Sequence, residues 1–188
     1  MIEKNRVEKN FSKNTATYDR NAIVQAYMAE ELINFIDLKK CVNVLELGCG
    51  TGIFSLRLTE KYHAARFKLM DISGEMIEAA KIKLAGNKIE FEVGDAEKST
   101  VFGEYDLIAG NAVIQWFNNP EETLKKYYSH LSPGGEMVFS TFGENTFYEL
   151  RNAFGLAGMS YDYSQKFYSK SEIEEIAERN KWNIEIQC

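Results

Sequence analysis

The sequence has few of the residues on which disulfide, metal or histidine chemistry depends. Of its 188 residues, only three are cysteine and two are histidine. Cys41, Cys49 and Cys188 are odd in number and show no C-x-x-C spacing, so we predict neither a disulfide framework nor a zinc site. His63 and His130 stand alone in the sequence, which argues against a metal centre or a Ser-His-Asp triad.

Long apolar runs and an excess of basic residues are also missing. No apolar run is long enough to span a bilayer, and no secretion-signal core follows the charged residues 1–6. The net charge is −6 and the isoelectric point is near 5.1, so broad electrostatic capture of nucleic acid or anionic membrane is not expected. We therefore predict a cytoplasmic protein that binds no metal, nucleic acid or membrane.

What the chain does have is a globular composition with alternating strand and helix signals. Hydrophobic residues make up 45% and charged residues 27%, and the length suits a single core. Strands are predicted over residues 42–47, 67–70, 89–93, 105–110, 136–141 and 182–187. Helices are predicted over residues 24–36, 53–61, 73–84, 120–130, 146–157 and 171–179. This alternation predicts a doubly wound, Rossmann-like α/β fold with a mostly parallel sheet.

Two local patterns mark the ends of these elements. Ser171 and Glu174 have the spacing of a capping box that would open the last helix. Residues 131–135 read Leu-Ser-Pro-Gly-Gly and fit a type II turn before the fifth strand. No repeat or linker divides the chain, so we expect a single domain over residues 1–188.

A glycine-rich loop follows the first predicted strand. Residues 46–52 read Glu-Leu-Gly-Cys-Gly-Thr-Gly, and a loop at the carboxyl edge of an open sheet is placed to hold a ligand. Its G-x-G-x-G spacing differs from the G-x-G-x-x-G that seats a dinucleotide pyrophosphate, so a ligand without a pyrophosphate is favoured. Glycines after a strand are also ordinary turn residues, so the loop alone decides little.

Acidic residues close the next two predicted strands. Asp71 ends the second, where a carboxylate can accept hydrogen bonds from both hydroxyls of a ribose. Asp95 follows the third and can accept from an exocyclic adenine amine, while the amide of Ala96 can donate to a ring nitrogen. Each of these features alone could be an ordinary turn. The glycine loop, Asp71 and Asp95 together, at the ends of three successive strands, are harder to explain as turns.

These segments resemble the class I methyltransferase signature in order and spacing, from about residue 42 to residue 141. The resemblance implies S-adenosylmethionine as the cofactor, with its methionine end over the glycine loop, its ribose on Asp71 and its adenine beside Asp95. The cofactor contacts that it implies are Glu46, Gly48, Gly50, Gly52, Asp71, Ile72, Met76, Asp95, Ala96 and Asn111.

A narrower resemblance covers most of the chain. Residues 111–116, Asn-Ala-Val-Ile-Gln-Trp, are similar to a segment of malonyl-[acyl-carrier protein] O-methyltransferases, which act in biotin synthesis, as are residues 11–19 and 139–151. This implies methyl transfer to the free carboxylate of a malonyl thioester on an acyl carrier protein, with Gln115 and Trp116 at the substrate. Members of that family usually continue for some tens of residues further, so we expect a chain truncated before the last strand of its sheet.

Two residues are candidates for binding the substrate on chemical grounds. An ionised malonyl carboxylate needs no general base but does need an anchor, and Arg151 can bind it through two hydrogen bonds. Tyr18 can close over the cofactor from an N-terminal helix. A surface arginine and a packing aromatic are equally ordinary explanations of these two residues.

The expected parts are a helical lid over residues 1–40, a cofactor-binding core over 42–141, and substrate-side helices with the sixth strand over 142–188. Because acyl carrier proteins are acidic, a partner should show a basic face. The candidates for that face are Lys125, Lys126, Arg151, Lys166 and Lys170. Two other functions stay open: methylation of another small metabolite in the same fold, and a module that binds the cofactor without turnover.

Overall fold

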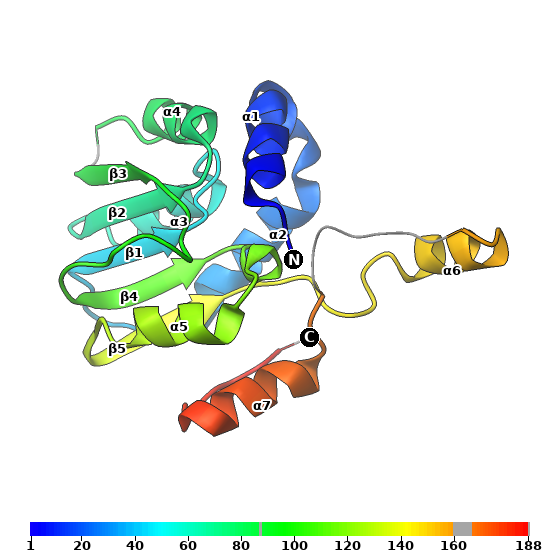
Figure 1. Ribbon diagram of the computed structural model, residues 1–188. Coiled ribbons are helices and arrows are strands. Elements are labelled where there is room, and N and C mark those ends of the chain that lie inside the picture. The colour runs from blue at the N-terminus through cyan, green and yellow to red at the C-terminus, as the bar shows by residue number, and fades with distance from the viewer. Residues whose placement is uncertain (87, 160–166, 188) are drawn as a thin grey trace.

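A five-stranded parallel sheet with the strand order β3-β2-β1-β4-β5 forms the centre of the molecule (Figure 1). The computed structural model describes residues 1–86, 88–159 and 167–187. The strands are β1 Asn43–Leu47, β2 Arg66–Asp71, β3 Ile89–Val93, β4 Tyr105–Gly110 and β5 Leu131–Phe139. The order of the strands reverses between β1 and β4, which opens a crevice at their carboxyl ends.

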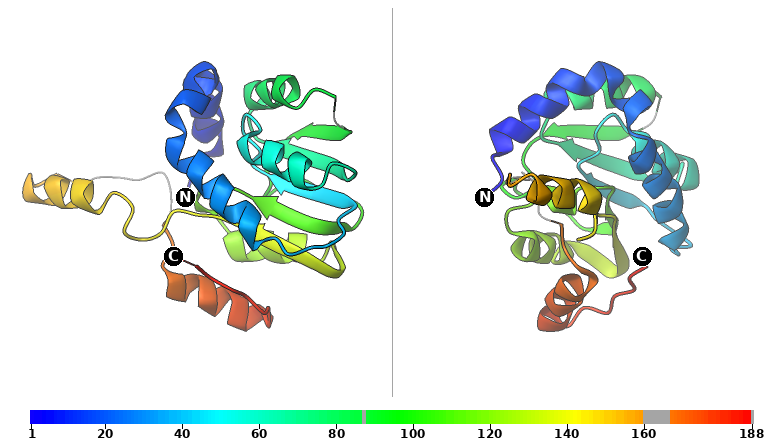
Figure 2. Two further views of the ribbon diagram at one scale, coloured as in Figure 1. Left: turned by 180° about the vertical axis from the view of Figure 1, so that it is seen from behind. Right: turned by 90° about the vertical axis from the view of Figure 1, so that its right-hand side faces the viewer.

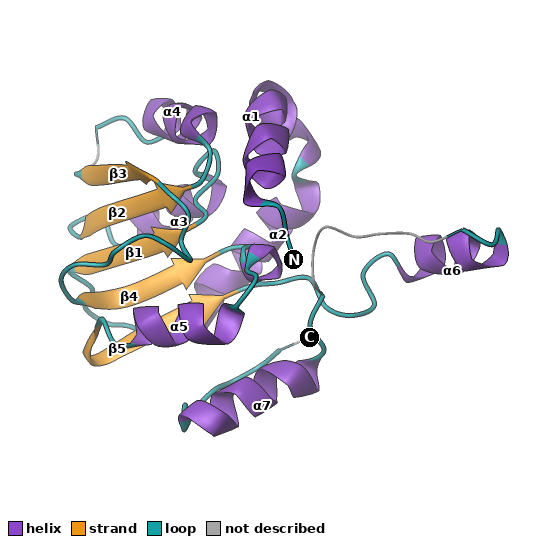
Figure 3. Cartoon of the chain, viewed as in Figure 1, coloured by secondary structure: helices purple, strands orange, loops and turns teal. Residues whose placement is uncertain are grey.

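Helices cover both faces of the sheet, as the alternating sequence pattern predicted (Figure 3). They are α1 Lys4–Asn21, α2 Ile23–Leu32, α3 Ile53–Lys61, α4 Gly74–Lys83, α5 Pro120–Tyr128, α6 Tyr148–Leu156 and α7 Lys170–Asn180, with short 3-10 turns at η1 Ile33–Phe35 and η2 Ile114–Trp116. α3 lies behind the sheet and α5 in front of it in Figure 1. α1 and α2 lie across the carboxyl ends of the strands, and α6 projects away from the sheet in the views of Figures 1 and 2.

The core consists of two apolar layers, one on each face of the sheet. Along β1, Val44 points into the layer that contains Phe54 and Leu58 of α3, whereas Leu45 points into the layer that contains Tyr127 of α5. This alternation follows from the two-residue period of a strand. Because both faces are buried, β1 has apolar side chains on both of them, and Glu46 is the buried polar exception. The doubly wound α/β prediction is confirmed.

The beginning of β5 differs from the prediction. It starts at Leu131, which pairs with Tyr105, although regular pairing begins only where Leu107 lies beside Glu136. The expected turn is therefore contained within an irregular strand, and Gly134 has the φ of +80° that the third position of a type II turn requires.

Two predictions near the C-terminus were wrong. The capping box of α7 is formed by Ser169 with Glu172, two residues earlier than expected. Residues 182–187 form no strand in the part of the chain that the structure describes. Lys181 ends α7 at a φ of +57°, and the Trp182 ring then packs against Tyr128 of α5, with ring centroids 5.2 Å apart. The chain consequently runs back beside α7 and does not pair with β5 (Figure 1).

Candidate active site

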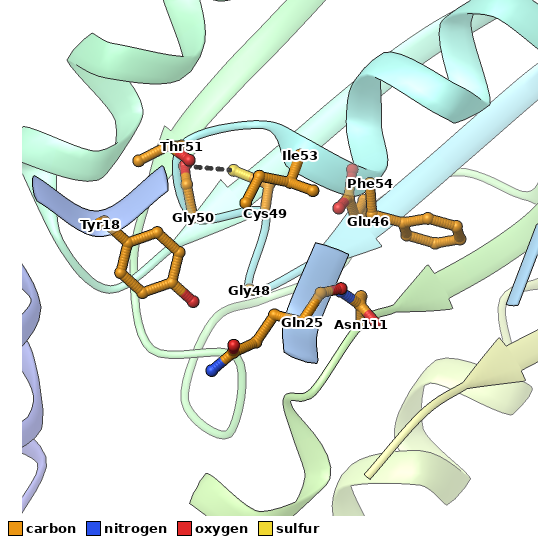
Figure 4. Close-up of a pocket in the computed structure, with 10 residues that line it drawn as sticks. All are labelled: Tyr18, Gln25, Glu46, Gly48, Cys49, Gly50, Thr51, Ile53, Phe54 and Asn111. Atoms are coloured by element: carbon orange, nitrogen blue, oxygen red, sulfur yellow. Dashed lines mark hydrogen bonds between the residues drawn. The ribbon is translucent and has the colours of Figure 1, made fainter. Parts of the chain in front are cut away.

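A pocket lies at the carboxyl ends of β1 and β4, beneath the N-terminal helices (Figure 4). The pocket and the solvent-open space at its mouth together have a volume of about 300 Å³. Its lining residues are Tyr18, Gln25, Glu46, Gly48, Cys49, Gly50, Thr51, Ile53, Phe54 and Asn111. The wall thus combines α1, α2, the glycine loop and the residue after β4, which are far apart in the sequence.

The glycine loop adopts a backbone that only glycine accommodates easily. Gly48 has a φ of +68° and Gly50 a φ of +54°. A Cβ atom on Gly48 would lie 2.6 Å from Cγ2 of Val113, whereas one on Gly50 would have no heavy atom within 4 Å. Gly48 is therefore required by packing, and Gly50 leaves open space beside the loop. Gly52, at a φ of +85°, is the N-cap of α3 and lies outside the lining.

Asp71 connects the glycine loop to the start of α4. Its carboxylate accepts hydrogen bonds from the Gly50 amide at 2.8 Å and from the Ser73 amide at 2.9 Å. Burial raises the pKa of Asp71, although these amides oppose the rise. Because each bond occupies one lone pair on a different oxygen, both oxygens keep acceptor capacity for a ligand. Ile72 follows half-buried, and Met76 is fully buried behind it in α4.

Glu46 is a buried carboxyl in the wall of the pocket. It is 1% exposed and accepts a hydrogen bond from Oγ of Ser55 at 2.6 Å. Burial raises the pKa of Glu46 to about 8; the charge of Asp71 adds to the rise and the Ser55 hydrogen bond opposes it. The group is therefore largely neutral near pH 7 until a cation lies beside it.

Asp95 places an unpaired acceptor at the end of β3. Its Oδ1 accepts from the Glu97 amide at 3.0 Å and lies 3.5 Å from Nζ of Lys4. Its Oδ2 is buried and has no hydrogen-bond partner among the described residues. A buried carboxylate oxygen without a donor is costly, so a ligand donor is the expected partner. Ala96 beside it is 8% exposed.

Side chains near the end of α1 contact the pocket, the glycine loop and α4. Tyr18 lines the pocket, and its pKa is raised to about 12 by burial and by the nearby Asp71 and Asp19. Asp19 accepts a hydrogen bond from the Thr51 hydroxyl and pairs with Nζ of Lys83 at 2.7 Å. Sequence reasoning missed Asp19, Thr51 and Lys83 because no local spacing marks contacts across such separations.

The segment after β4 is ordered by polar side chains. Asn111 lines the pocket and donates through Nδ2 to the carbonyl of Gln25 at 2.8 Å. Gln115 is 1% exposed and donates to the carbonyl of Ala112 at 2.6 Å. The Trp116 ring meets Phe11 of α1 edge to face, with centroids 5.4 Å apart. Neither Gln115 nor Trp116 is among the residues that line the pocket. Gln25 does line it, although no sequence pattern had marked that residue.

The structure does not bring Arg151 to the pocket. Arg151 lies on α6, where its Nη2 donates to the carbonyl of Glu144 at 2.6 Å. α6 stands apart from the sheet in both the front and rear views (Figures 1 and 2).

The basic face predicted near the C-terminus is not formed by the described residues. Lys126 donates to the carbonyls of Ala96, Glu97 and Ser99, and burial lowers its pKa. Lys170 pairs with Glu174 at 3.8 Å. Lys125 is exposed on α5, and Lys166 lies outside the described residues.

The described residues contain neither a cluster of metal-ligating side chains nor a membrane-spanning helix. No group of three or more His, Cys, Asp or Glu side chains there could hold a metal ion. None of the helices in those ranges has the length and hydropathy needed to cross a bilayer.

Comparisons with known proteins agree on one family. A family model described as a methyltransferase domain matches residues 18–186. The chain is 41% identical to malonyl-[acyl-carrier protein] O-methyltransferase 1 of Ilyobacter polytropus, over 96% of this chain and 68% of that protein. It is 38% identical to the malonyl-[acyl-carrier protein] O-methyltransferase of Priestia megaterium, over 95% of this chain and 69% of that protein.

Solved structures share the fold at lower identity. The DhpI-SAM-HEP complex superposes with a TM-score of 0.74 at 18% identity, over 95% of this chain and 89% of that one. The methyltransferase bound to the Haloferax volcanii Trm112 activator gives a TM-score of 0.73 at 19% identity, over 92% of this chain and 75% of that one.

Proposed function

The chain belongs to the malonyl-[acyl-carrier protein] O-methyltransferase family, and from this membership we propose that it methylates the free carboxylate of a malonyl thioester, using S-adenosylmethionine, in biotin synthesis. The membership rests on the methyltransferase domain match over residues 18–186 and on the 41% identity over nearly the whole chain. The feature of the site that supports the proposal most directly is the buried, unpaired Oδ2 of Asp95.

The polar groups at the carboxyl edge of the sheet fit the three parts of this cofactor. The adenine amine is a donor of the kind that Oδ2 of Asp95 lacks. Asp71 keeps acceptor capacity on both oxygens for the ribose hydroxyls. The open space beside Gly50 admits the methionine end. Ile72 and Ala96 directly follow the two carboxylates, and we assign them, with Met76 behind, to the surroundings of the adenine.

We assign the cofactor ammonium to the neighbourhood of Glu46 and Asn111, which line the same pocket. A cation close to Glu46 favours its ionised form and lowers the raised pKa of that carboxyl. Cofactor binding is therefore expected to release a proton from Glu46 near neutral pH. Gly48, Gly50 and Gly52 keep the loop that borders this region in its left-handed turns.

When bound, S-adenosylmethionine supplies a methyl group on a positively charged sulfur. The protein has to align an acceptor in line with that bond and exclude water. A malonyl carboxylate, with a reference pKa of about 4, is already ionised at neutral pH, so no general base is needed. Tyr18, with a pKa raised to about 12, stays a neutral phenol and can donate a hydrogen bond to the acceptor.

We also propose that the malonyl group arrives on an acyl carrier protein, the substrate that the names of the relatives state for those enzymes. Tyr18, Gln115, Trp116 and Arg151 remain the proposed substrate residues. Of these Tyr18 lines the pocket, whereas Arg151 requires α6 to approach it. A cytoplasmic location is part of the same proposal, since Cys41 and Cys49 are free thiols and reducing compartments keep thiols in that state.

The decisive experiment is product formation with methyl-labelled cofactor. Malonyl-carrier protein, malonyl-coenzyme A and unrelated small carboxylic acids are offered in parallel, and the labelled methyl ester is isolated. Ester on the malonyl thioesters supports the proposal. Product only on another small acid points to methylation of another metabolite, and tight binding of S-adenosylhomocysteine without any product points to a module that does not turn over.

A further inference from the structure

The solvent side of α1 carries four basic side chains without acidic partners. Arg6, Lys9, Lys13 and Arg20 follow one another at intervals of three, four and seven residues, which places them on one face of a helix. All four are exposed. None of them forms a salt bridge within the described ranges. These four residues are called the α1 basic stripe below.

The acidic residues of α1 lie on its other side. Asp19 faces Thr51 and Lys83 at the glycine loop, and Glu8 is half-buried. Tyr18, on the same side, lines the pocket. In a chain with a net charge of −6, this separation concentrates positive potential on the outer face of a helix whose inner face forms the pocket wall.

Exposed apolar side chains continue this surface onto α2. Ile23, Val24 and Tyr27 are 73%, 53% and 65% exposed; they are called the α2 lip below. Gln25, between them in sequence, lines the pocket, and Asn111 binds its carbonyl. The lip is therefore carried by a helix that also contributes to the pocket wall, and Figure 4 shows Gln25 of that helix beside Asn111. An apolar patch beside charged residues is the composition of a protein docking surface.

We propose that the α1 basic stripe and the α2 lip together form the docking surface for the acidic acyl carrier protein that delivers the malonyl group. This inference rests on the proposed function and names the partner surface of the same site. Charge complementarity selects an acidic partner, and the lip adds an apolar contact that a freely solvated helix does not need. A carrier docked there lies about one helix diameter, roughly 10–12 Å, from the pocket.

Other partners for a basic helix fit this surface less well. An amphipathic helix that binds membranes inserts a free apolar face along its length, whereas Val7 of α1 is buried and Phe11 packs against Trp116. Nucleic acid binding depends mainly on the number of basic groups near phosphates, and outside the stripe the chain is acidic overall.

A charge reversal with a matched control tests the proposal. Lys9→Glu/Lys13→Glu inverts the centre of the stripe. Lys39→Glu/Lys88→Glu makes the same charge change at exposed lysines that precede β1 and β3, at the opposite edge of the sheet. Lysine and glutamate have similar helix propensities, so α1 should stay folded. Binding of fluorescently labelled malonyl-carrier protein to the full chain is measured by anisotropy at low and high salt.

The stripe variant should bind the carrier about tenfold more weakly at low salt and with a shallower salt dependence, while the control variant binds as the wild type does. Affinity for S-adenosylhomocysteine should change less than about twofold in both, because the stripe faces away from the pocket. The rate of methylation of a small malonyl thioester that has no carrier protein, such as malonyl-N-acetylcysteamine, should also be the same in both variants. Tyr27→Ser should weaken carrier binding at both salt concentrations, since its contact is apolar.

Failure of this inference and failure of the proposed function have different signatures. Equal carrier binding by wild type, stripe variant and control overturns the docking surface even if the wild type methylates the carrier. Selective loss of carrier binding in the stripe variant supports the surface even if no ester forms, which would count against the proposed function alone. Equally tight binding of an unrelated acidic protein, of RNA or of anionic vesicles at the stripe overturns the assignment to a carrier.

Discussion

Glu46 and Asp71 end neighbouring strands as buried carboxyls, and burial raises the pKa of each. Their partners differ: a hydroxyl donates to Glu46, whereas two backbone amides donate to Asp71. Glu46 is therefore the group whose charge can respond to a ligand, and Asp71 is the group that shapes the loop. The carboxyl ends of β1 and β2 thus carry two buried acids with different roles, one electrostatic and one structural.

The titration of Glu46 should appear in the stability of the cofactor-free protein. Unfolded glutamate titrates near about 4.3, and in the folded protein the pKa of Glu46 is about 8. The folded protein binds this proton more tightly than the unfolded chain does, so protonation of Glu46 stabilises the fold. That stabilisation is complete below the unfolded pKa and is lost as the pH rises toward the folded pKa of about 8. Urea unfolding should show a free energy of unfolding that falls from about pH 5 to pH 8, and Glu46→Gln should flatten this pH dependence.

Ser55→Ala removes the hydrogen bond that lowers the pKa of Glu46, so in this variant the free energy of unfolding should keep falling to a higher pH. An unchanged slope in Glu46→Gln would assign it to other groups such as Asp71.

Asp95→Ala should reduce cofactor affinity more than stability. The free Oδ2 gains a partner only when the ligand binds, so its removal should weaken S-adenosylhomocysteine binding by about 1–3 kcal/mol. Calorimetric titration and thermal unfolding measure the two effects separately. A variant that melts far below the wild type yet binds the ligand normally would show that Asp95 serves the fold, through the Glu97 amide and Lys4.

Asp71→Ala should reduce both affinity and stability, because the side chain also holds the Gly50 and Ser73 amides. Loss of a buried acceptor costs about 1–3 kcal/mol for the groups left unpaired, so both the dissociation constant and the urea midpoint should shift. An unchanged dissociation constant in a folded variant would remove Asp71 from the site. Comparison with Asp95→Ala, measured in the same way, separates ligand contact from loop support.

At the scale of elements, sequence patterns predicted the ends of most strands, because the local pattern of apolar residues determines where those strands start and stop. β1 to β4 lie within a residue of their predicted ends because each has apolar residues at consecutive or alternate positions and stops at glycine or aspartate. The irregular start of β5 depends on its pairing with Tyr105, and the coil after α7 depends on the docking of Trp182 against Tyr128. A short stretch of sequence predicts neither the start of β5 nor the coil after α7, because each depends on a contact between segments that are distant in the sequence.

The same limit applies to the residues of the candidate site. The positions of Gly48, Gly50, Asp71 and Asp95 were predictable because each is fixed by its place at a strand end, and their contacts with the cofactor stay a proposal. The position of α1 depends on tertiary contacts, chiefly those of Asp19 with Thr51 and Lys83. Sequence reasoning therefore anticipated Tyr18 as a residue of a lid but not the contacts that hold the helix in place.

Lys83→Met should loosen α1 without unfolding the protein. Partly exposed ion pairs contribute only about 0.2–1 kcal/mol, so the melting temperature should change little. Hydrogen exchange at the end of α1 should nevertheless rise, and S-adenosylhomocysteine affinity should fall a few-fold, roughly the value of one such contact. Lys81→Met is the matched control, since Lys81 pairs with Glu78 on the same helix at 2.6 Å. Equal exchange in both variants would show that the Asp19 pair does not hold α1.

At the scale of the whole molecule, the segment that carries α6 leaves the sheet side after β5 and returns to it before α7. Gly143 and Tyr168 form a parallel bridge where the chain leaves and returns. Between them α6 exposes apolar side chains, among them Leu156 at 91% and Tyr148 at 53%. A substrate role for Arg151 would require this helix to lie closer to the pocket, whose lining includes no residue of α6.

Arg151→Ala tests that role. If Arg151 anchors the malonyl carboxylate, its charge-assisted hydrogen bonds contribute about 1.5–3 kcal/mol, and kcat/KM for the malonyl thioester should fall roughly tenfold to a hundredfold. Cofactor affinity should stay within about twofold, and Arg151→Lys should rescue only in part because the forked geometry is lost. Arg179→Ala, which removes a surface arginine paired with Glu121 on α5, is the control and should turn over normally.

Hydrogen exchange across residues 148–156 provides the second readout, because an anchored α6 should become protected only when S-adenosylhomocysteine and a malonyl thioester are both present. Protection without any kinetic effect of Arg151→Ala would mean that α6 closes through its apolar side chains and that the arginine is incidental. Normal turnover without protection would instead place the anchor among pocket residues, where Tyr18 offers a neutral donor and Gln25 an amide. Because these outcomes differ in both measurements, the pair of experiments assigns the anchor to α6 or to the pocket.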